Sequence, residues 1–390
     1  MLRCKEAIYL GEEVTAGRER LELGPVLITG GAGFLGRFLA ARLDASGCRV
    51  TILDDLSCAN STFGCAALAS DRIRKIRGSV FDRTLVTELV STHPVVVHLA
   101  SVVGVEETVS HTVPTIENLS GTINVVRALT RDHVVVFASS ADVYGVHSRL
   151  YDRPMREDDL LVYESGRVNR WVYPHVKALE ENLFSNRAAR SVVVRVFNCY
   201  GAEMDYPAPK RVIPHFIDCI LHRRPLLLSG DGKQRRSFCY VDDMIDGFVA
   251  VLNHAAVGQD SRDECFNLGH PEPIAIRDLA HLMVDRAVHL GLIVEPLPVI
   301  ADRFVYSQGF DDRWHRTPDI TRAARALGFS PRVALREGLG RTLAYYQRLQ
   351  GTSDLLRPDW RPSALGAIPG GPQVPVGATR APTGPIPSSG

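Results

Sequence analysis

The chain has 390 residues, 45% of them hydrophobic, so it can fill one large core or two ordinary ones. The formal net charge is +1 and the basic residues are spread along the sequence, which argues against nucleic acid or an anionic membrane as the partner. The eight cysteines contain no C-x-x-C pair, and no His/Cys group has zinc spacing, so we expect reduced thiols and no metal site.

The N-terminal extension, residues 1–22, carries acidic residues where a signal peptide needs an apolar run. No later segment approaches the length of a membrane-spanning helix. We therefore expect a cytoplasmic protein whose partner is a small molecule or another protein.

The first predicted strand, "PVLITG", runs into a glycine-rich turn that contains Gly30, Gly33 and Gly36 and opens a helix over 35–43. Glycine lets the backbone turn tightly and lets a pyrophosphate approach the helix N-terminus, where free N–H groups favour anions. The alternative interpretation is a strand-to-helix turn that binds no ligand.

The second predicted strand, "RVTILDD", ends in Asp54, at the spacing where a carboxylate accepts the hydroxyls of an adenosine ribose. A carboxylate there repels a 2′-phosphate, which favours NAD over NADP. Arg37 is a nearby cation that would instead suit the phosphate of NADP.

Further Val-rich runs, "VVVHLA", "HVVVFASS" and "SVVVRVFN", lack polar alternation, as expected of parallel strands covered on both faces. Helical stretches such as 121–129 separate them, and this βαβα order predicts a doubly wound α/β sheet of the Rossmann type. After Tyr200 the segments become shorter and richer in Pro and Arg, which indicates a smaller α/β substrate-binding lobe. The predicted organisation is a Rossmann domain of 23–199 with 236–268, a lobe of 200–235 with 269–350, and a disordered Pro/Gly-rich tail of 351–390.

Polar side chains follow the strand "HVVVFASS" at the carboxyl edge of the predicted sheet, where such folds bind ligands. They are Ser139, Ser140 and Asp142. Downstream, Pro174 is tolerated only in the first turn of a helix, so a helix begins near Trp171.

In this helix Tyr173 and Lys177 lie one turn apart on the same face. An adjacent ammonium favours the phenolate, so Lys177 can activate Tyr173 as a base, and Ser140 can share the substrate hydroxyl with it. A surface tyrosine beside a surface lysine is the alternative.

The chain resembles the extended short-chain dehydrogenases that modify nucleotide sugars, from about Leu23 to Arg348. The motifs that carry the resemblance occur in the family order: "TGGAGFLG", "HLAS", "NLSGT", "SSADVYG", "YPHVK", "RVFNCYG", "GDGKQRRSFCYVDD", "FNLGH" and "RTPDITRAARALGFSP". The resemblance implies an NAD-dependent enzyme that oxidises a sugar at C4.

The resemblance also implies the roles of individual residues. Ser140, Tyr173 and Lys177 would be catalytic, with Asp142 beside them. Substrate would contact Asn198, Arg236 and Arg316. The guanidinium groups of the two arginines suit a diphosphate or a carboxylate. NAD would contact Gly30, Gly33, Phe34, Leu35, Gly36, Asp54, Leu99, Ala100, Tyr173 and Lys177.

Two residues depart from the family pattern. Glu203 stands where relatives commonly have arginine, and Ser79 stands where an aspartate usually approaches the adenine.

The reaction that follows C4 oxidation is left open by the motifs. Sugar 4,6-dehydratases have an Asp-Glu pair where this chain has Ala141-Asp142, and 4-epimerases need no carboxylate there. UDP-glucuronate decarboxylases have a glutamate at the position of Asp142, and in that branch the arginine matching Arg316 sits beside the sugar carboxylate. "NRWVYPHVK" and "YSQGFDDRWHRTPDI" resemble this branch, which favours decarboxylation of UDP-glucuronate to a UDP-pentose or its 4-keto form.

Other features have simpler interpretations. We expect packed or solvated side chains at His98, His133, His281 and His289, and core or pocket-wall positions for Phe238, Tyr240 and Trp314. The helical segments 121–129 and 172–184 can pair with a second subunit, as in dimeric relatives. A non-enzymatic NAD-binding sensor is the alternative of another class, although such a protein has no need for an activated tyrosine.

Overall fold

The computed structural model describes residues 23–58, 61–102, 108–109, 111–164, 169–185, 189–204, 211–257, 264–302 and 315–350. The chain divides into two units, Met1–Gln347 and Arg348–Gly390, and the fold and the site belong to the first. The predicted N-terminal extension and tail lie outside the described residues, as does Trp314.

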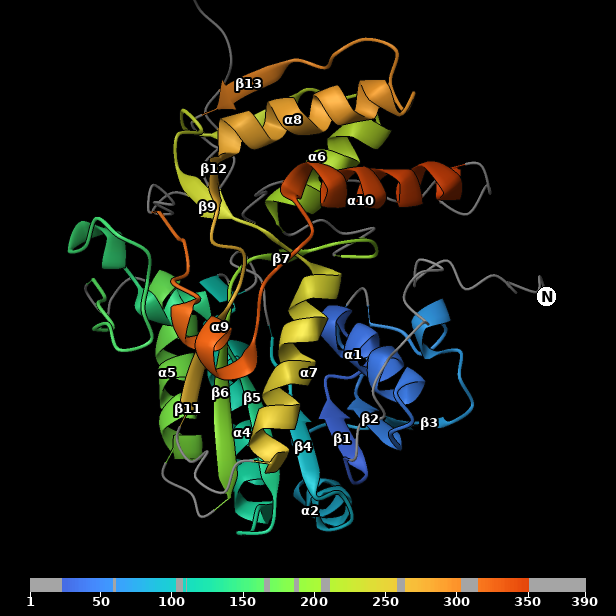
Figure 1. Ribbon diagram of the computed structural model, residues 1–390, viewed down its shortest axis with the longest axis vertical. Helices are drawn as coiled ribbons and strands as arrows, with labels where there is room; N and C mark the ends of the chain where they lie inside the picture. The colour runs from blue at the N-terminus through green and yellow to red at the C-terminus, as the bar shows by residue number, and fades with distance from the viewer. Residues whose placement is uncertain are drawn as a thin grey trace, which may run out of the picture. The chain divides into compact units, whose positions relative to one another are not determined.

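A seven-stranded parallel sheet forms the centre of the fold (Figure 1). Its strand order is β11-β6-β5-β4-β1-β2-β3, so the order reverses between β1 and β4. The predicted Rossmann-type fold is thereby confirmed. The strands are β1 (Val26–Thr29), β2 (Val50–Asp54), β3 (Ile73–Arg77), β4 (Val95–His98), β5 (Val134–Ser140), β6 (Arg190–Val196) and β11 (Glu264–Leu268).

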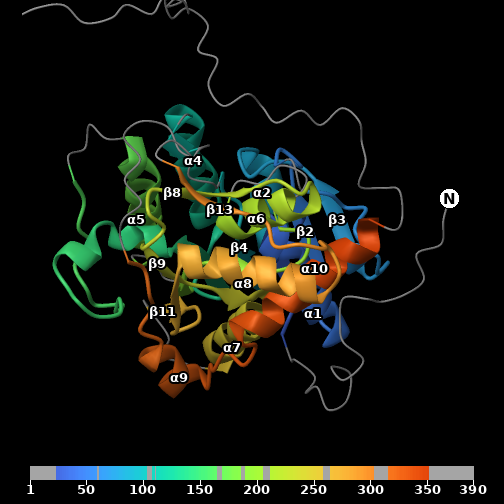
Figure 2. The ribbon, with the colours of Figure 1, turned by 90° about the horizontal axis from the view of Figure 1, so that it is seen from above.

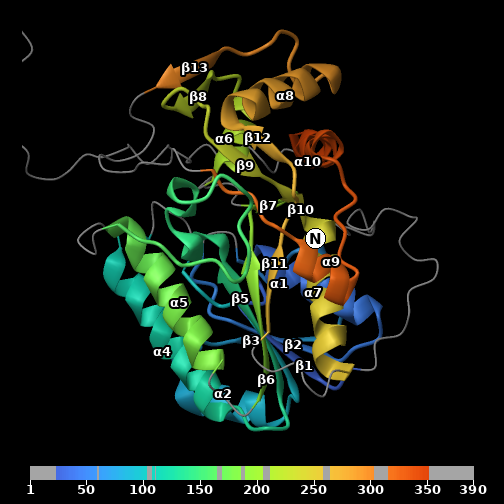
Figure 3. The same ribbon diagram turned by 60° about the vertical axis from the view of Figure 1, so that its left-hand side comes forward.

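Helices cover both faces of this sheet (Figure 3). One face packs against α2 (Arg83–Ser91), α4 (Thr112–Ala128) and α5 (Val172–Ser185), and the other against α1 (Phe34–Ala45) and α7 (Val241–Val257). Because both faces are covered, β1, β2 and β4 are buried along their whole length, as their unbroken apolar runs predict.

The core between the sheet and the α4/α5 face contains aromatic contacts. Phe137 of β5 stacks on Phe184 of α5 with ring centroids 4.7 Å apart, and both side chains are buried. Helix α5 begins at Val172, after the 3₁₀ turn η5 (Asn169–Trp171), and Pro174 lies in its first turn as predicted. The packing fixes the helix that carries Tyr173 against the sheet.

Smaller elements lie beyond the carboxyl edge of the sheet (Figures 1 and 2). Pairing joins β8 to β13, β9 to β12 and β7 to β10, and α8 packs on α6. These elements are β7 (Cys199–Tyr200), α6 (Val212–Leu221), β8 (Leu226–Ser229), β9 (Arg235–Ser237), β10 (Cys239–Tyr240), β12 (Pro273–Ala275), α8 (Ile276–His289), β13 (Val299–Asp302) and α10 (Leu335–Gln350). Helix α9 (Thr321–Leu327) instead packs on α7 and β11 of the sheet. The division into two domains stays a prediction.

In the described part of the chain, no helix combines the length and apolarity needed to cross a membrane.

Candidate functional site

One cavity of about 590 Å³ lies at the carboxyl ends of the sheet strands, with lining residues from both sides of the strand-order reversal. All the residues that we predicted for cofactor, chemistry and substrate line it. They are Gly30, Gly33, Phe34, Leu35, Gly36, Asp54, Leu99, Ala100, Ser140, Asp142, Tyr173, Lys177, Asn198, Arg236 and Arg316.

The glycine turn has no room for side chains at two of its positions. Gly30 has φ +70°, and a Cβ on it would lie 2.7 Å from the backbone nitrogen of Ala100. A Cβ on Gly36 would lie 2.3 Å from the carbonyl oxygen of Gly30. Gly33 caps helix α1, where a Cβ would meet only the Gly30 oxygen, at 3.2 Å. The turn therefore leaves the helix N-terminus open to the cavity, which fits a pyrophosphate.

Asp54 lies at the end of β2 beside this turn. Its carboxylate accepts hydrogen bonds from the backbone N–H groups of Ala32, at 3.0 Å, and Leu56, at 2.8 Å. Burial raises the pKa of Asp54, and these hydrogen bonds act in the opposite direction. The carboxylate is thus held at the cavity wall, where it can accept ribose hydroxyls. Ser79 lies nearby, with its hydroxyl 3.5 Å from the Asp55 carboxylate.

Arg37 pairs with Glu203, so its guanidinium group is not positioned to bind a 2′-phosphate. Its side chain is buried, its Nε lies 3.2 Å from the Glu203 carboxylate, and its Nη2 donates to the Glu203 carbonyl oxygen at 2.9 Å. Tyr345 also donates to the Glu203 carboxylate, at 3.0 Å. Glu203 therefore binds a cation of helix α1, and the pairing removes the reason to expect NADP.

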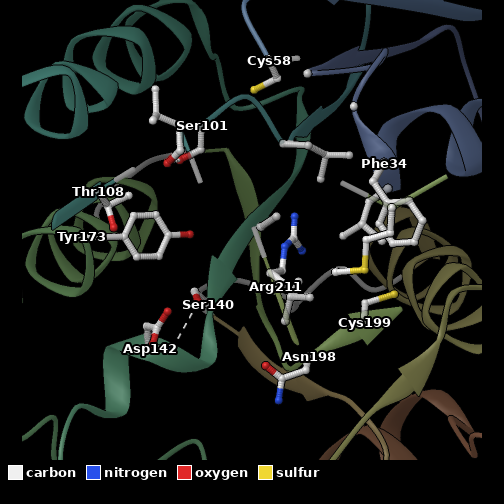
Figure 4. Close-up of a pocket in the computed structure, with 18 of the residues that line it drawn as sticks. Phe34, Cys58, Ser101, Thr108, Ser140, Asp142, Tyr173, Asn198, Cys199 and Arg211 are labelled. Carbon is white, nitrogen blue, oxygen red and sulfur yellow. Dashed lines mark hydrogen bonds between the residues drawn. The ribbon is translucent and has the colours of Figure 1, made fainter. Parts of the chain in front are cut away.

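Tyr173, Ser140 and Asp142 face one another across the cavity (Figure 4). The hydroxyl of Tyr173 points into the cavity, and the Ser140 oxygen accepts the backbone N–H of Asp142 at 3.1 Å. That bond leaves the hydroxyl proton of Ser140 to be donated, and its acceptor is the Tyr173 oxygen. Lys177 donates from Nζ to the Ala138 carbonyl oxygen at 3.3 Å and lies 5.9 Å from the centroid of the Tyr173 ring.

The expected phenolate is not the resting form. Burial raises the pKa of Tyr173, whereas the Lys177 ammonium and the hydrogen bond of Ser140 lower it. Burial alone would lower the pKa of Lys177, but the nearby Glu180 carboxylate and Tyr173 raise it. Lys177 therefore acts in the predicted direction on Tyr173, but burial outweighs it.

Asp142 is held by two guanidinium groups. Its Oδ1 lies 2.7 Å from Arg170 Nη2 and 2.5 Å from Arg316 Nη1. Burial alone would raise the pKa of Asp142, but Arg316, Arg170 and the more distant Arg236 lower it well below its usual range. Asp142 is thus an ionised partner of arginines, a role that its position after the strand did not predict.

Backbone pairing brings the substrate-side residues together. Arg236 and Arg316 form a parallel β-bridge, so two guanidinium groups enter the cavity from neighbouring backbones. Asn198 donates its side-chain amide to the Ser237 carbonyl oxygen at 3.0 Å. Arg211, at the N-terminus of α6, lines the same part of the cavity, and no pattern in the sequence had marked it.

Arg170 is a buried partner of Asp142 that the sequence motifs did not predict. It precedes Tyr173 by three residues, a spacing that places both side chains on one face of a helical turn. The three-residue spacing from Tyr173 was the sequence signal that could have identified Arg170 as a neighbour of the site. The catalytic and substrate-binding roles of these side chains are proposals.

Side chains with simpler interpretations lie where we expected. His98 and His133 are buried and hydrogen-bonded, and His281 and His289 are exposed. Phe238 and Tyr240 are buried, with Phe238 in the cavity wall. In the described ranges no three His, Cys, Asp or Glu side chains gather as a metal site would require.

Comparison with known proteins identifies the family. Residues 26–269 match the NAD dependent epimerase/dehydratase family. UDP-N-acetyl-alpha-D-glucosaminuronate decarboxylase of Bacillus cytotoxicus is 33% identical over 329 residues, which cover 83% of this chain and 98% of the relative. UDP-glucuronic acid decarboxylase 1 of Arabidopsis thaliana is 29% identical, over 86% of this chain and 72% of the relative.

A solved structure shares the fold and part of the sequence. It is UDP-glucuronic acid 4-epimerase from Bacillus cereus, in complex with UDP-glucuronic acid and NAD. It is 26% identical, with a TM-score of 0.70, over 83% of this chain and 99% of that one. The predictions of the family, of an NAD-dependent enzyme and of nucleotide-sugar modification are confirmed. The chain belongs to the NAD dependent epimerase/dehydratase family, the extended short-chain dehydrogenases that its motifs resemble.

Proposed function

We propose that this enzyme decarboxylates a UDP-hexuronate through transient oxidation at C4, with UDP-glucuronate as the first candidate substrate. The observation that carries the proposal is the charge of the sugar end of the cavity. Among the described residues, the guanidinium groups of Arg170 and Arg316 contact Asp142, and Arg236 also lowers its pKa, so this end of the cavity is rich in cations. A sugar carboxylate would gain a guanidinium partner here, which a neutral hexose would not.

The glycine turn, Asp54 and Lys177 would hold NAD, which when bound supplies the acceptor for the C4 hydride. Tyr173 accepts the C4 hydroxyl proton as the C4–H electron pair leaves, and Ser140 donates a hydrogen bond to the same oxygen. Lys177 keeps a positive charge beside Tyr173 and favours its phenolate.

Oxidation at C4 turns a C5 carboxylate into part of a β-keto acid. The C5–C6 bond then breaks, CO₂ leaves, and its electron pair forms an enolate at C4 and C5. Ser140 and the protonated Tyr173 donate hydrogen bonds to the enolate oxygen. Protonation at C5 gives the 4-keto pentose, and return of the hydride to C4 gives the UDP-pentose.

Asp142 has no proton-transfer role in this scheme. A carboxylate paired with two guanidinium groups and with a lowered pKa donates protons poorly, so we do not assign it the C5 proton. Arg316, which lines the cavity, would bind the substrate carboxylate in the ground state in place of Asp142. The two decarboxylase relatives act on uronates according to their names, which agrees with this assignment.

Product analysis tests the proposal. The protein is incubated with NAD and with UDP-glucuronate, UDP-N-acetylglucosaminuronate or UDP-glucose, and CO₂ and the products are measured, the latter by mass spectrometry. We expect CO₂ from a uronate, and none from UDP-glucose or from Tyr173→Phe. Epimerisation of UDP-glucuronate without CO₂ would replace the proposal with a uronate 4-epimerase, the activity for which the Bacillus cereus relative is named. Interconversion or dehydration of a neutral sugar alone, or no reaction at all, would overturn it.

We also infer a homodimer. Helices α4 and α5 lie side by side, and they expose Val113, Ile116 and Leu179.

A cytoplasmic location stays a proposal as well. The cysteines in the described ranges are thiols, which suits a reducing compartment.

A further inference from the structure

A second carboxylate stands behind the Tyr173–Lys177 pair and has no role in the steps above. Glu180 lies on α5, one turn after Lys177, and its side chain is fully buried. Its Oε2 lies 3.0 Å from Lys177 Nζ. Lys177 is itself 3% exposed, so the ion pair is closed off from water.

One hydrogen bond holds the Glu180 carboxylate from α4, and a chain of hydrogen bonds through β4 to β1 supports its donor. Thr122 of α4 donates to Glu180, and the Thr122 oxygen lies 3.0 Å from His98 Nε2. His98 Nδ1 lies 2.7 Å from the Thr29 hydroxyl, at the end of β1. Burial lowers the pKa of His98 to about 4, so its ring is neutral, with Nε2 as donor and Nδ1 as acceptor. A continuous chain of donors therefore runs from Thr29 to Glu180 and fixes its carboxylate beside Lys177.

Other charged groups also face the catalytic pair. Asp142 faces Tyr173 from η3 (Ala141–Tyr144), and Glu181 of α5 acts weakly on Lys177. Glu181 is committed elsewhere, because it binds the guanidinium group of Arg195 at 2.8 Å. Above the ammonium lies an aromatic face, the Phe137 ring, at 4.7 Å. Glu180 is thus the carboxylate that, among the described residues, forms a salt bridge with Lys177.

We propose that Glu180 is a positioning residue that fixes the Lys177 ammonium and sets the pH at which Tyr173 becomes a phenolate. The inference rests on the proposed role of Tyr173 as the base. The negative charge of Glu180 offsets part of the positive charge of Lys177, so Tyr173 ionises at higher pH than it would beside Lys177 alone. The pair is therefore tuned by a group that does not touch the substrate.

The test is Glu180→Gln, which keeps the size of the side chain and an acceptor for Thr122 but removes the charge. The pH dependence of kcat should move its acid limb down by about half a unit to one unit, because an opposite charge nearby no longer offsets Lys177. Glu181→Gln, which removes the neighbouring carboxylate, should move the limb less. An unchanged limb, or one displaced to higher pH, in Glu180→Gln would overturn the proposal.

A measurement without turnover separates this inference from the proposed function. Tyrosinate formation is followed by ultraviolet difference titration, and the Tyr173 contribution is obtained by subtracting the curve of Tyr173→Phe. Ionisation should begin at lower pH in Glu180→Gln, whatever sugar the enzyme accepts. Equal titration curves in wild type and variant would overturn the inference and leave the proposed function intact.

Two further variants cover a loss of folding. Glu180→Asp keeps the charge and should retain a pH dependence closer to that of the wild type. If Glu180→Gln is too unstable to assay, the double variant Glu180→Gln/Lys177→Met should melt at a higher temperature than Glu180→Gln, because it removes the uncompensated ammonium. A double variant no more stable than the single one would contradict the pairing.

Discussion

At the scale of the residue, two guanidinium groups converge on one oxygen of Asp142. In the proposed function, the carboxylate of an acidic sugar would bind Arg316 as well. Asp142 and the substrate carboxylate would then compete for Arg316. The proposed function and the resting structure are linked through this competition.

Asp142→Asn tests the competition directly. Removing the charge should tighten binding of a UDP-hexuronate relative to UDP-glucose, by on the order of tenfold, or ~1.4 kcal/mol. Calorimetric titration with both sugars measures this ratio, and UDP-glucose supplies the internal control. Weaker binding of the uronate in the variant would mean that Asp142 supports the substrate carboxylate instead of competing with it.

The glycines of the first turn make a second prediction at residue scale. Gly36→Ala places a methyl group 2.3 Å from a backbone oxygen, so the variant should lose much of its thermal stability. In Gly33→Ala the added methyl group would lie 3.2 Å from the nearest backbone atom, the Gly30 oxygen, and the φ of residue 33 is negative. The melting temperature of this variant should therefore be close to that of wild type. Its methyl group stands at the N-terminus of α1, so NAD binding should weaken.

Thermal melts and NAD titrations of the two glycine variants separate their effects. A Gly33→Ala protein that binds NAD like wild type would show that the pyrophosphate does not approach this helix end. Equal loss of stability in both variants would show that the turn is uniformly tight.

At the scale of the element, β4 carries a histidine whose titration contributes to acid sensitivity. Burial lowers the pKa of His98 from 6.5 to about 4. Between these values the unfolded chain binds a proton at His98 that the folded chain does not. The free energy of unfolding therefore rises with pH across this window, and this contribution to stability is lost as the pH falls. A shift of that size is worth about 3 kcal/mol.

His98→Gln should therefore flatten the dependence of unfolding free energy on pH between about 4 and 6.5. The measurement is urea unfolding at several pH values, with the difference from wild type isolating His98 from the other histidines. His281→Gln, at an exposed position of α8, is the matched control and should leave the slope unchanged. An unaltered slope in His98→Gln would mean that His98 takes up its proton over the same pH range in the folded and unfolded states.

Elements whose sequence carries a local signal were predictable. The apolar runs of β1, β2, β4, β5 and β6 match strands, and Pro174 marks the start of α5. β3 was missed because its sequence "IRKIR" has three basic residues among five and no apolar run. It lies at the sheet edge, where charges discourage pairing with another chain. β11 was not predicted as a strand either, and it joins the sheet only through pairing with β6.

The site was predictable to the same degree. The glycine turn, Asp54 and the Tyr173–Lys177 pair depend on short spacings, and all line the cavity. The partner of Asp142 could not be read from sequence, because Arg316 reaches it only through the β-bridge to Arg236. The burial of Tyr173, which raises its pKa, could not be predicted from the sequence either.

At the scale of the whole molecule, α4 and α5 expose three large apolar side chains. Val113 and Ile116 on α4 are 64% and 51% exposed, and Leu179 on α5 is 55% exposed. Apolar side chains grouped on two adjacent helices are typical of an interface between proteins. Because Leu179 lies two residues after Lys177, packing of a second copy here would also hold the helix that carries the catalytic pair.

Leu179→Glu should therefore convert a dimer into a monomer, because a buried, unpaired carboxylate in each copy opposes association. Size-exclusion chromatography with light scattering gives the mass directly. Val294→Glu changes an equally apolar residue, 86% exposed, that follows α8, and should leave the dimer intact. A wild-type protein that is monomeric, or a Leu179→Glu protein that stays dimeric, would place any subunit contact elsewhere. If the dimer supports α5, the monomeric variant should also turn over more slowly at equal NAD saturation.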